Sequence, residues 1–184
     1  MKPTDLQAAG WHQSAVDFVA RLARDRGSRS QLRRATTPPA LYGIELAHGL
    51  VDALGLATPR RSPTAILEQE RAYRLASLLA WLPEDAGSVA ESFGAAMRRD
   101  NRVSPLRFGR LLRTRKPSEL QQQFRRALAQ IKYRCHPGEL AHLFLRWHTE
   151  SVQRGVAYEY FQTSAPEPFE TEKSVDATAT AEQE

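Results

Sequence analysis

The sequence predicts an all-α protein, a helical bundle built as two small helical bundles packed together. Apolar residues recur at intervals of three and four along most of the chain, which is the spacing of one helix face. Gly and Pro fall between these segments, and no stretch alternates apolar and polar residues as a half-buried strand does. With 184 residues, 41% of them hydrophobic, the chain is long enough to bury a real core.

The chain divides into four expected segments: a flexible N-terminus, an N-terminal helical half, a C-terminal helical half and a disordered acidic tail (residues 1–10, 11–100, 101–163 and 164–184). The tail carries six acidic residues and one lysine, with almost no large apolar side chain, so it cannot bury enough surface to fold. Because the tail holds a charge of −5, the rest of the chain carries +10 instead of the overall +5.

In the N-terminal half, a first helix is expected from Trp11 to Gly27, which is placed to end it. A basic, polar stretch follows and ends at Pro38. Residues 40–54 are mostly apolar and predict a second helix. Pro63 occupies a first helical position, from which a long third helix is expected to run to Leu82.

The remaining helices carry their own start signals. Ser88-x-x-Glu91 has the pattern of a capping box and predicts a fourth helix that ends near residue 99. Pro105 begins a short helix, and Ser118-x-x-Gln121 is a second capping box. Pro137 begins the last and longest helix, which is expected to continue to about residue 161. The strongest apolar stripe of this half consists of Leu120, Phe124, Ala127, Leu128 and Ile131.

Positive charge is concentrated between Arg98 and Arg134, where twelve basic residues face two acidic ones. Of the 26 basic residues in the chain only four are lysine. Arginine presents a planar fork of donors that matches phosphate oxygens, and it stays charged when partly desolvated. A GC-rich coding sequence also favours arginine, and this explanation stays open. An excess of positive charge on helices that also carry an apolar, core-facing stripe indicates a surface that binds a polyanion. The polyanion that fits best is nucleic acid.

The arginines are spaced so that several share a helix face. Arg107, Arg110 and Arg113 are three apart and sweep only about 120° of a helix. Arg33 and Arg34 lie on a short segment of the first half that can fold back onto the same surface. Aromatic residues, on which bases could stack, are sparse near the arginines. The surface is therefore expected to bind the nucleic-acid backbone without distinguishing one base from another. The predicted nucleic-acid-binding residues are Arg33, Arg34, Arg99, Arg107, Arg110, Arg113, Arg125, Arg126 and Lys132.

No catalytic or metal-binding constellation stands out, so we expect neither an enzyme nor a cofactor. The nearest cluster is Cys135, His136, His142 and His148. A six-residue step turns a helix by about 240°, so His142 and His148 would face different ways on one helix. The single cysteine and the absence of an apolar signal segment predict a cytoplasmic protein. No apolar run approaches the length of a membrane span.

Four motifs resemble, in order and spacing, those of the CasB family, the small subunit of the type I-E CRISPR surveillance complex called Cascade. The resemblance covers most of residues 11–161. The motifs are Leu32-Arg33-Arg34-Ala35, then Arg107-Phe108-x-Arg110-Leu111-Leu112, then Pro117-x-Glu119-Leu120 leading into Phe124-Arg125-Arg126-Ala127-Leu128, and finally Trp147 with Ala157-Tyr158-x-Tyr160-Phe161.

This resemblance implies a non-catalytic, all-helical subunit of an antiviral RNA-guided complex. It implies as partners the backbone and large subunits, the crRNA, the target DNA with its displaced strand, and a second copy of the chain itself. In RNA-guided recognition, base pairing with the guide RNA determines which sequence is bound. Protein contacts with the nucleic-acid backbone shift a nearly balanced strand exchange toward the R-loop. The resemblance therefore implies R-loop stabilisation by phosphate contacts that do not depend on sequence.

Two other functions remain open at this point. A helical DNA-binding regulator would need a recognition helix with base-reading amides. Gln121, Gln122 and Gln123 supply such amides, but the turn before them lacks a tight helix-turn-helix pattern. A purely structural helical adaptor would direct its arginines at acidic protein partners.

Overall fold

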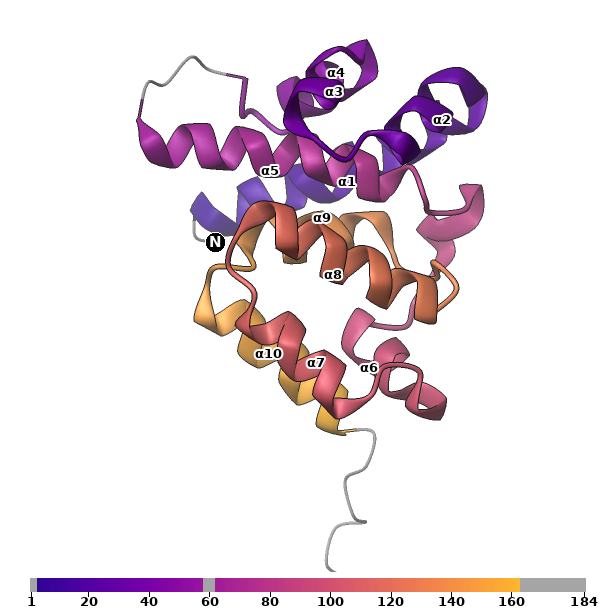
Figure 1. Ribbon diagram of the computed structural model, residues 1–184, viewed down its shortest axis with the longest axis vertical. Coiled ribbons are helices and arrows are strands. Elements are labelled where there is room, and N and C mark those ends of the chain that lie inside the picture. The colour runs from indigo at the N-terminus through magenta and orange to yellow at the C-terminus, as the bar shows by residue number, and fades with distance from the viewer. Residues whose placement is uncertain (1–2, 58–61, 163–184) are drawn as a thin grey trace, which may run out of the picture.

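The computed structural model describes residues 3–57 and 62–162, and within these ranges the regular secondary structure is helical with no strand (Figure 1). The all-α prediction is confirmed. The predicted tail, 164–184, lies outside the described residues. The helices are α1 (Pro3–Arg24), α2 (Arg26–Arg34), α3 (Pro38–Tyr42), α4 (Glu45–Ala53), α5 (Pro63–Leu79), α6 (Phe93–Arg98), α7 (Pro105–Arg113), α8 (Pro117–Gln130), α9 (Pro137–Arg146) and α10 (Glu150–Gln162), with short 3-10 helices at Glu84–Ser88 and Arg99–Asn101.

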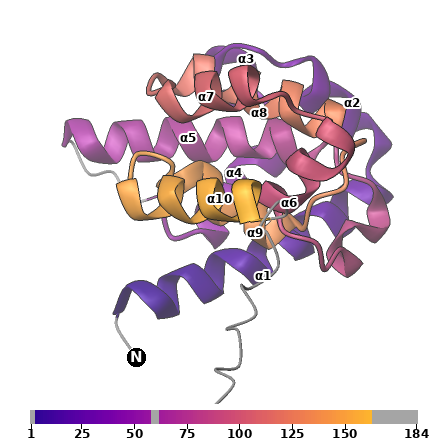
Figure 2. The same cartoon turned by 90° about the horizontal axis from the view of Figure 1, so that it is seen from below.

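Helices α8 and α9 lie at the centre of the molecule. On one side α1 packs against α9, and α5 packs against both α8 and α9, with α2, α3 and α4 covering α1 and α5 (Figure 1). On the other side α6 packs against α10 and α7 packs against α8. Figure 2 shows α7 and α8 on one face of the molecule and α1 on the opposite face. Within the described ranges, no helix combines the length and the apolar character that crossing a bilayer requires.

Helices from both halves of the sequence share one continuous cluster of buried side chains. At its centre, the ring of Phe124 on α8 stacks on Phe93 of α6, with 5.4 Å between the ring centroids. Phe144 and Trp147 meet the same ring edge-on, at 5.4 and 5.0 Å. The apolar stripe predicted for α8 is buried along its length. The division of the chain near residue 100 stays a prediction.

The boundaries of the first helices differ from the expected ones. Helix α1 begins at Pro3, so part of the stretch predicted to be a flexible N-terminus is helical, and its flexibility stays a prediction. Gly27 was expected to end the first helix, but it lies in the first turn of α2. The local reason is Asp25, whose carboxylate accepts hydrogen bonds from the Ser28 amide at 2.9 Å and from the Ser28 hydroxyl at 2.7 Å. This N-cap starts a new helix before Gly27 is reached.

The helix expected at 40–54 is two helices, α3 and α4, separated at Gly43 and Ile44. Gly55 follows α4 with a φ of +70°, a left-handed conformation that glycine adopts without steric cost. The third helix begins at Pro63 as predicted, with the Ser62 hydroxyl accepting from the Ala65 amide at 3.2 Å.

Both predicted capping boxes are wrong. Ser88 ends a 3-10 helix, and the N-cap of α6 is Ser92, whose hydroxyl accepts from the Ala95 amide at 3.4 Å. Helix α8 begins at Pro117, so Ser118 lies within its first turn. Gln121 is buried and accepts a hydrogen bond from Arg74 of α5 at 2.7 Å. Its side chain therefore ties α8 to α5 instead of capping α8.

The last helix is interrupted, so the prediction of one long helix is wrong. Helix α9 ends at Arg146 and α10 begins at Glu150. The indole N–H of Trp147 donates to the carbonyl of Leu111 at 3.2 Å, and the carbonyl of Trp147 accepts from the Gln153 amide at 2.7 Å. The side-chain amide of Gln153 thus satisfies the backbone carbonyl of Trp147, which a continuous helix would have bonded internally, and the indole bond ties the turn to α7.

Helix α10 approaches α6 closely because α6 carries Gly94. A Cβ atom added at Gly94 would lie 2.7 Å from the Cβ of Glu159 and 2.8 Å from the carbonyl oxygen of Val156. Any side chain at this position would push the two helices apart. The absence of a side chain therefore sets their separation, and with it the packing of the lower part of the molecule in Figure 1.

Candidate nucleic-acid interface

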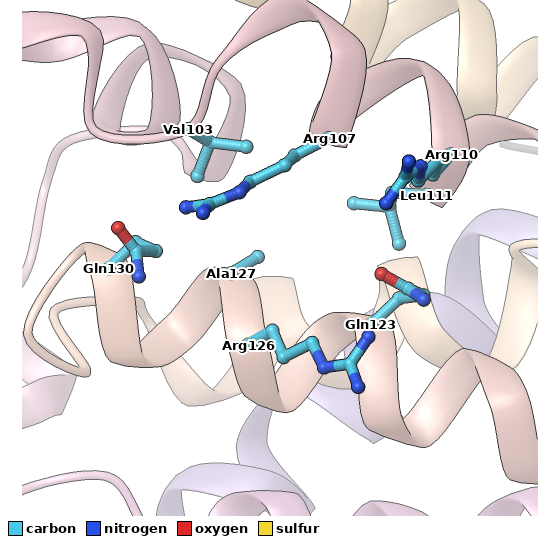
Figure 3. Close-up of a pocket in the computed structure, with 8 residues that line it drawn as sticks. All are labelled: Val103, Arg107, Arg110, Leu111, Gln123, Arg126, Ala127 and Gln130. Carbon is cyan, nitrogen blue, oxygen red and sulfur yellow. The ribbon is translucent and has the colours of Figure 1, made fainter.

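A cleft of about 330 Å³ lies between α7 and α8, on the face opposite α1. On α7, Phe108 and Leu111 point into the core, which leaves the arginines of this helix toward solvent. On α8, cleft residues recur at steps of three and four, the spacing that places side chains on one helix face. The cleft is lined by Val103, Arg107, Arg110, Leu111, Gln123, Arg126, Ala127 and Gln130 (Figure 3).

Three of the predicted arginines line this cleft. Arg107 and Arg110 line it from α7, and Arg126 lines it from α8, where its side chain runs along the helix toward Gln123 (Figure 3). Within the part of the chain that the structure describes, none of their guanidinium groups has a carboxylate within ion-pair distance. Three uncompensated cations around one concave site produce a positive potential that attracts anions.

Other basic residues of the chain are neutralised by neighbours. Arg99, a predicted site residue, binds Glu91 at 2.6 Å. Lys116 lies 3.4 Å from Glu119. A cation paired with a carboxylate adds little to the positive potential at the surface. Arg99 therefore attracts an anion less strongly than the unpaired arginines of the cleft do.

A second group of cations lies on Trp81, which follows α5. The guanidinium carbon of Arg125 is 4.6 Å from the centroid of the Trp81 ring, and that of Arg33 is 5.1 Å away. The ring of Tyr133 stacks on Trp81 at 5.5 Å with an interplanar angle of 16°. Arg33 also donates from Nε to the carbonyl of Ala80 at 2.8 Å. Arg33 of the N-terminal half and Arg125 of the C-terminal half thus approach the same ring, and the predicted fold-back onto one DNA-binding surface stays a prediction.

The two groups are joined through α8, because Arg125 and Arg126 are consecutive residues. Arg125 turns toward Trp81, and Arg126 lines the cleft. Burial, followed by the charge of Arg29, lowers the pKa of Arg33 from its ordinary value, although an arginine stays protonated in proteins. Arg33 therefore contributes charge from a half-buried position, beside the more exposed Arg125.

The remaining predicted residues lie outside the cleft. Arg34 donates to the carbonyl of Ser30 at 3.2 Å and lines a separate hollow beside Ile44. Arg113 is exposed near the end of α7 and is not part of the cleft lining. Lys132 is exposed in the turn after α8, at a φ of +57°.

The sequence indicated Gln123 only as an amide for a base-reading regulator, and it did not indicate Gln130, Trp81 or Tyr133, which also shape this surface. The two glutamines share the face of Arg126 through helical spacing, which is a readable signal. The stack of Trp81 on Tyr133 joins segments far apart in the sequence, and no local pattern indicates it.

The cysteine and the histidines do not form a site together. Cys135 is buried, and burial raises the pKa of its thiol well above the usual range, which disfavours the reactive thiolate. His136 accepts from the Gly138 amide at 3.1 Å as the N-cap of α9. His148 lies after the end of α9 and contacts Arg71 at 2.9 Å. Among the described residues, no three His, Cys, Asp or Glu side chains are grouped to hold a metal ion.

The fold and the cleft define an all-helical protein with a concave, uncompensated arginine surface. The family model for CRISPR-associated protein Cse2 matches residues 28–161, and the chain belongs to this family. It is therefore a CRISPR-associated Cascade subunit, in the family of the type I-E small subunit also called CasB. No curated protein matches the chain, and no solved structure does.

Proposed function

We propose that this subunit is non-catalytic and holds nucleic acid in the assembled Cascade complex by phosphate contacts that do not depend on sequence. The observation that carries the proposal is the cleft between α7 and α8, where Arg107, Arg110 and Arg126 have no carboxylate partner among the described residues. Guanidinium groups form bidentate hydrogen bonds with phosphate oxygens and gain most where no internal acid competes.

The ligand of this surface is the target DNA, including the strand displaced when the crRNA pairs with its target. Strand exchange in an RNA-guided complex is close to balanced. Contacts with the DNA backbone that contribute a few kcal/mol therefore shift it toward the R-loop, in which the strand is displaced. The subunit would also bridge the backbone and large subunits, beside a second copy of itself.

Two alternatives make different predictions. A base-reading regulator would use the three consecutive glutamines of α8, but Gln121 is buried against Arg74, so this amide is not presented to DNA. A structural adaptor is favoured by exposed apolar side chains on α7 and α10: Leu106, Tyr158 and Phe161 are 64%, 64% and 58% exposed. An adaptor would need these side chains for assembly and would bind DNA no better than a protein of equal charge.

Binding of the isolated full-length chain to a short duplex tests the proposal. A triple variant, Arg107→Gln, Arg110→Gln and Arg126→Gln, should bind more weakly and lose about three units of salt slope, one for each phosphate contact. The matched control, Arg21→Gln, Arg24→Gln and Arg26→Gln, removes the same charge from exposed positions on α1 and α2. Equal losses for the two triples would show that net charge, and not the cleft, drives binding.

A further inference from the structure

The cleft between α7 and α8 has more than cations in its lining. Its floor is formed by the core residues Val103 and Leu111, which leave only 3% and 2% of their surface exposed, together with the small side chain of Ala127. An apolar floor gives nothing to a phosphate, which needs only donors and positive charge. A ligand with an apolar part can contact this narrow floor as well as the arginines.

Two side-chain amides also face into the cleft. Gln123 and Gln130 enter from α8, near opposite ends of the lining in Figure 3. Each amide carries two donors and one acceptor oxygen, the groups found on the pairing edges of nucleobases. Neither glutamine has a hydrogen-bond partner among the described residues. Their hydrogen-bonding groups are therefore open to a ligand.

The third feature is the course of Arg107, which reaches across the cleft from α7 toward Gln130 and passes beside Val103 (Figure 3). A guanidinium plane in this position offers a flat surface, and proteins that bind single strands stack unpaired bases on such planes. The volume of about 330 Å³ lies at the small end of ligand pockets, which suits one nucleotide and not a stacked duplex.

From these three features we infer that the cleft binds one unstacked nucleotide of a single-stranded nucleic acid. On a single strand, Arg110 and Arg126 hold the flanking phosphates, while the base lies against Arg107 with its pairing edge toward Gln130, the glutamine beside the Arg107 guanidinium in Figure 3. This inference rests on the proposed function and adds the base to the ligand. A duplex would first have to unpair and extrude a base, which is unfavourable, so the cleft selects for single strands.

Selectivity among the four bases is weak in this arrangement. An amide can present either its donors or its oxygen after rotation about the last side-chain bond, so it can pair with any base edge. The site therefore detects that a base is present and unpaired, without fixing which base it is. This property suits a displaced strand of any sequence.

The test measures binding of the full-length chain to three fluorescent oligonucleotides of equal length and charge: single-stranded DNA, RNA of the same sequence, and abasic DNA. Stacking on one base is worth about 1–3 kcal/mol, so the normal strands should bind roughly 5- to 150-fold more tightly than the abasic strand. The DNA and RNA arms show which sugar the cleft accepts, because only RNA presents a 2′-hydroxyl.

The double variant Gln123→Ala and Gln130→Ala keeps every charge and should reduce this preference for normal strands severalfold, leaving abasic binding unchanged. Gln122→Ala is the control, since Gln122 is exposed on α8 outside the cleft lining. Equal affinity of the unmodified chain for normal and abasic strands would overturn the inference and leave the proposed function standing. Failure to bind either strand would instead overturn both.

Discussion

The guanidinium carbon of Arg125 lies 4.6 Å from the ring centroid of Trp81, and Arg33 approaches the same ring from the other half of the sequence. One indole therefore fixes two cations that no local sequence pattern places together. Tyr133 stacks on the ring as well, which holds Trp81 in place. Trp81 is thus a positioning residue for the basic surface and carries no charge itself.

Replacing Trp81 by leucine should weaken DNA binding without removing a phosphate contact. Each cation–π contact at a partly exposed site is worth about 0.5–1 kcal/mol, so the melting temperature should fall modestly. Affinity should fall while the salt slope stays constant, because the same number of arginines still meets phosphate. Trp81→Phe, which keeps an aromatic face, should retain most of the affinity. A slope reduced as strongly as in Arg125→Gln would contradict a positioning role.

Binding of the isolated chain to nucleic acid should depend steeply on salt. If about five phosphates are neutralised, log K against log salt should have a slope near −4.5 for duplex and near −3.5 for single strands. Anisotropy titrations at several salt concentrations measure both slopes. A slope near zero, or more than tenfold preference for one duplex sequence, would exclude sequence-independent binding through contacts with the phosphates.

The core around Phe124 should tolerate truncation badly. Phe124 is fully buried and contacts three aromatic rings, so Phe124→Ala leaves a cavity and should cost about 3–5 kcal/mol in the free energy of unfolding. Trp147→Ala should cost a similar amount and also loses the hydrogen bond to Leu111. Single changes of Arg107 or Arg110 to Gln should stay within about 0.5 kcal/mol, because these residues are exposed. Urea denaturation of the four variants compares them directly.

Glu139 should make stability fall as the pH rises. Burial raises the pKa of this carboxyl from 4.5 to about 7, with the nearby Glu159 adding to the shift and a hydrogen bond from the Phe93 amide opposing it. Because the folded chain holds the proton more tightly than the unfolded chain, the contribution is complete below about pH 4.5 and is lost as the pH rises through 7.

Glu139→Gln keeps an acceptor for the Phe93 amide and removes the charge. The variant should therefore match the unmodified chain near pH 4 and exceed its stability by up to about 3 kcal/mol near pH 8. Comparing the two chains at each pH cancels the titration of the histidines. A difference in the free energy of unfolding that does not change between pH 4 and 8 would mean that Glu139 is ionised throughout.

Periodicity was enough to predict the helical fold and the buried stripe of α8, because one helix face is set by neighbours three and four residues away. Helix boundaries were predicted less well where two local signals compete. Asp25 overrides Gly27, and the α9 break depends on Trp147 reaching a carbonyl of α7. That contact joins separate helices, which spacing within one helix cannot reveal.

The same limit applies to the candidate site. The charge density of residues 98–134 indicated the region in which the cleft lies, but it could not separate Arg126 in the cleft from Arg99, which is paired with Glu91. Pairing depends on which acids the fold brings near, and Glu91 reaches Arg99 across α6. The role of Trp81 was not predicted, because its partners come from α2, α8 and the turn after α8.

The central claim is that the cleft arginines hold DNA in the assembled complex, and one paired measurement tests it. Cascade is reconstituted with Arg107→Gln, Arg110→Gln and Arg126→Gln combined, or with the charge-matched triple at Arg21, Arg24 and Arg26. Copurification with crRNA reports assembly, and footprinting of the displaced strand reports R-loop formation. We expect the cleft triple to assemble normally and to lose about tenfold or more in R-loop formation, equivalent to about 1.4 kcal/mol, while the control keeps both. Poor assembly of the cleft triple, with normal target binding by the complex that does form, would show that the cleft is a protein–protein surface.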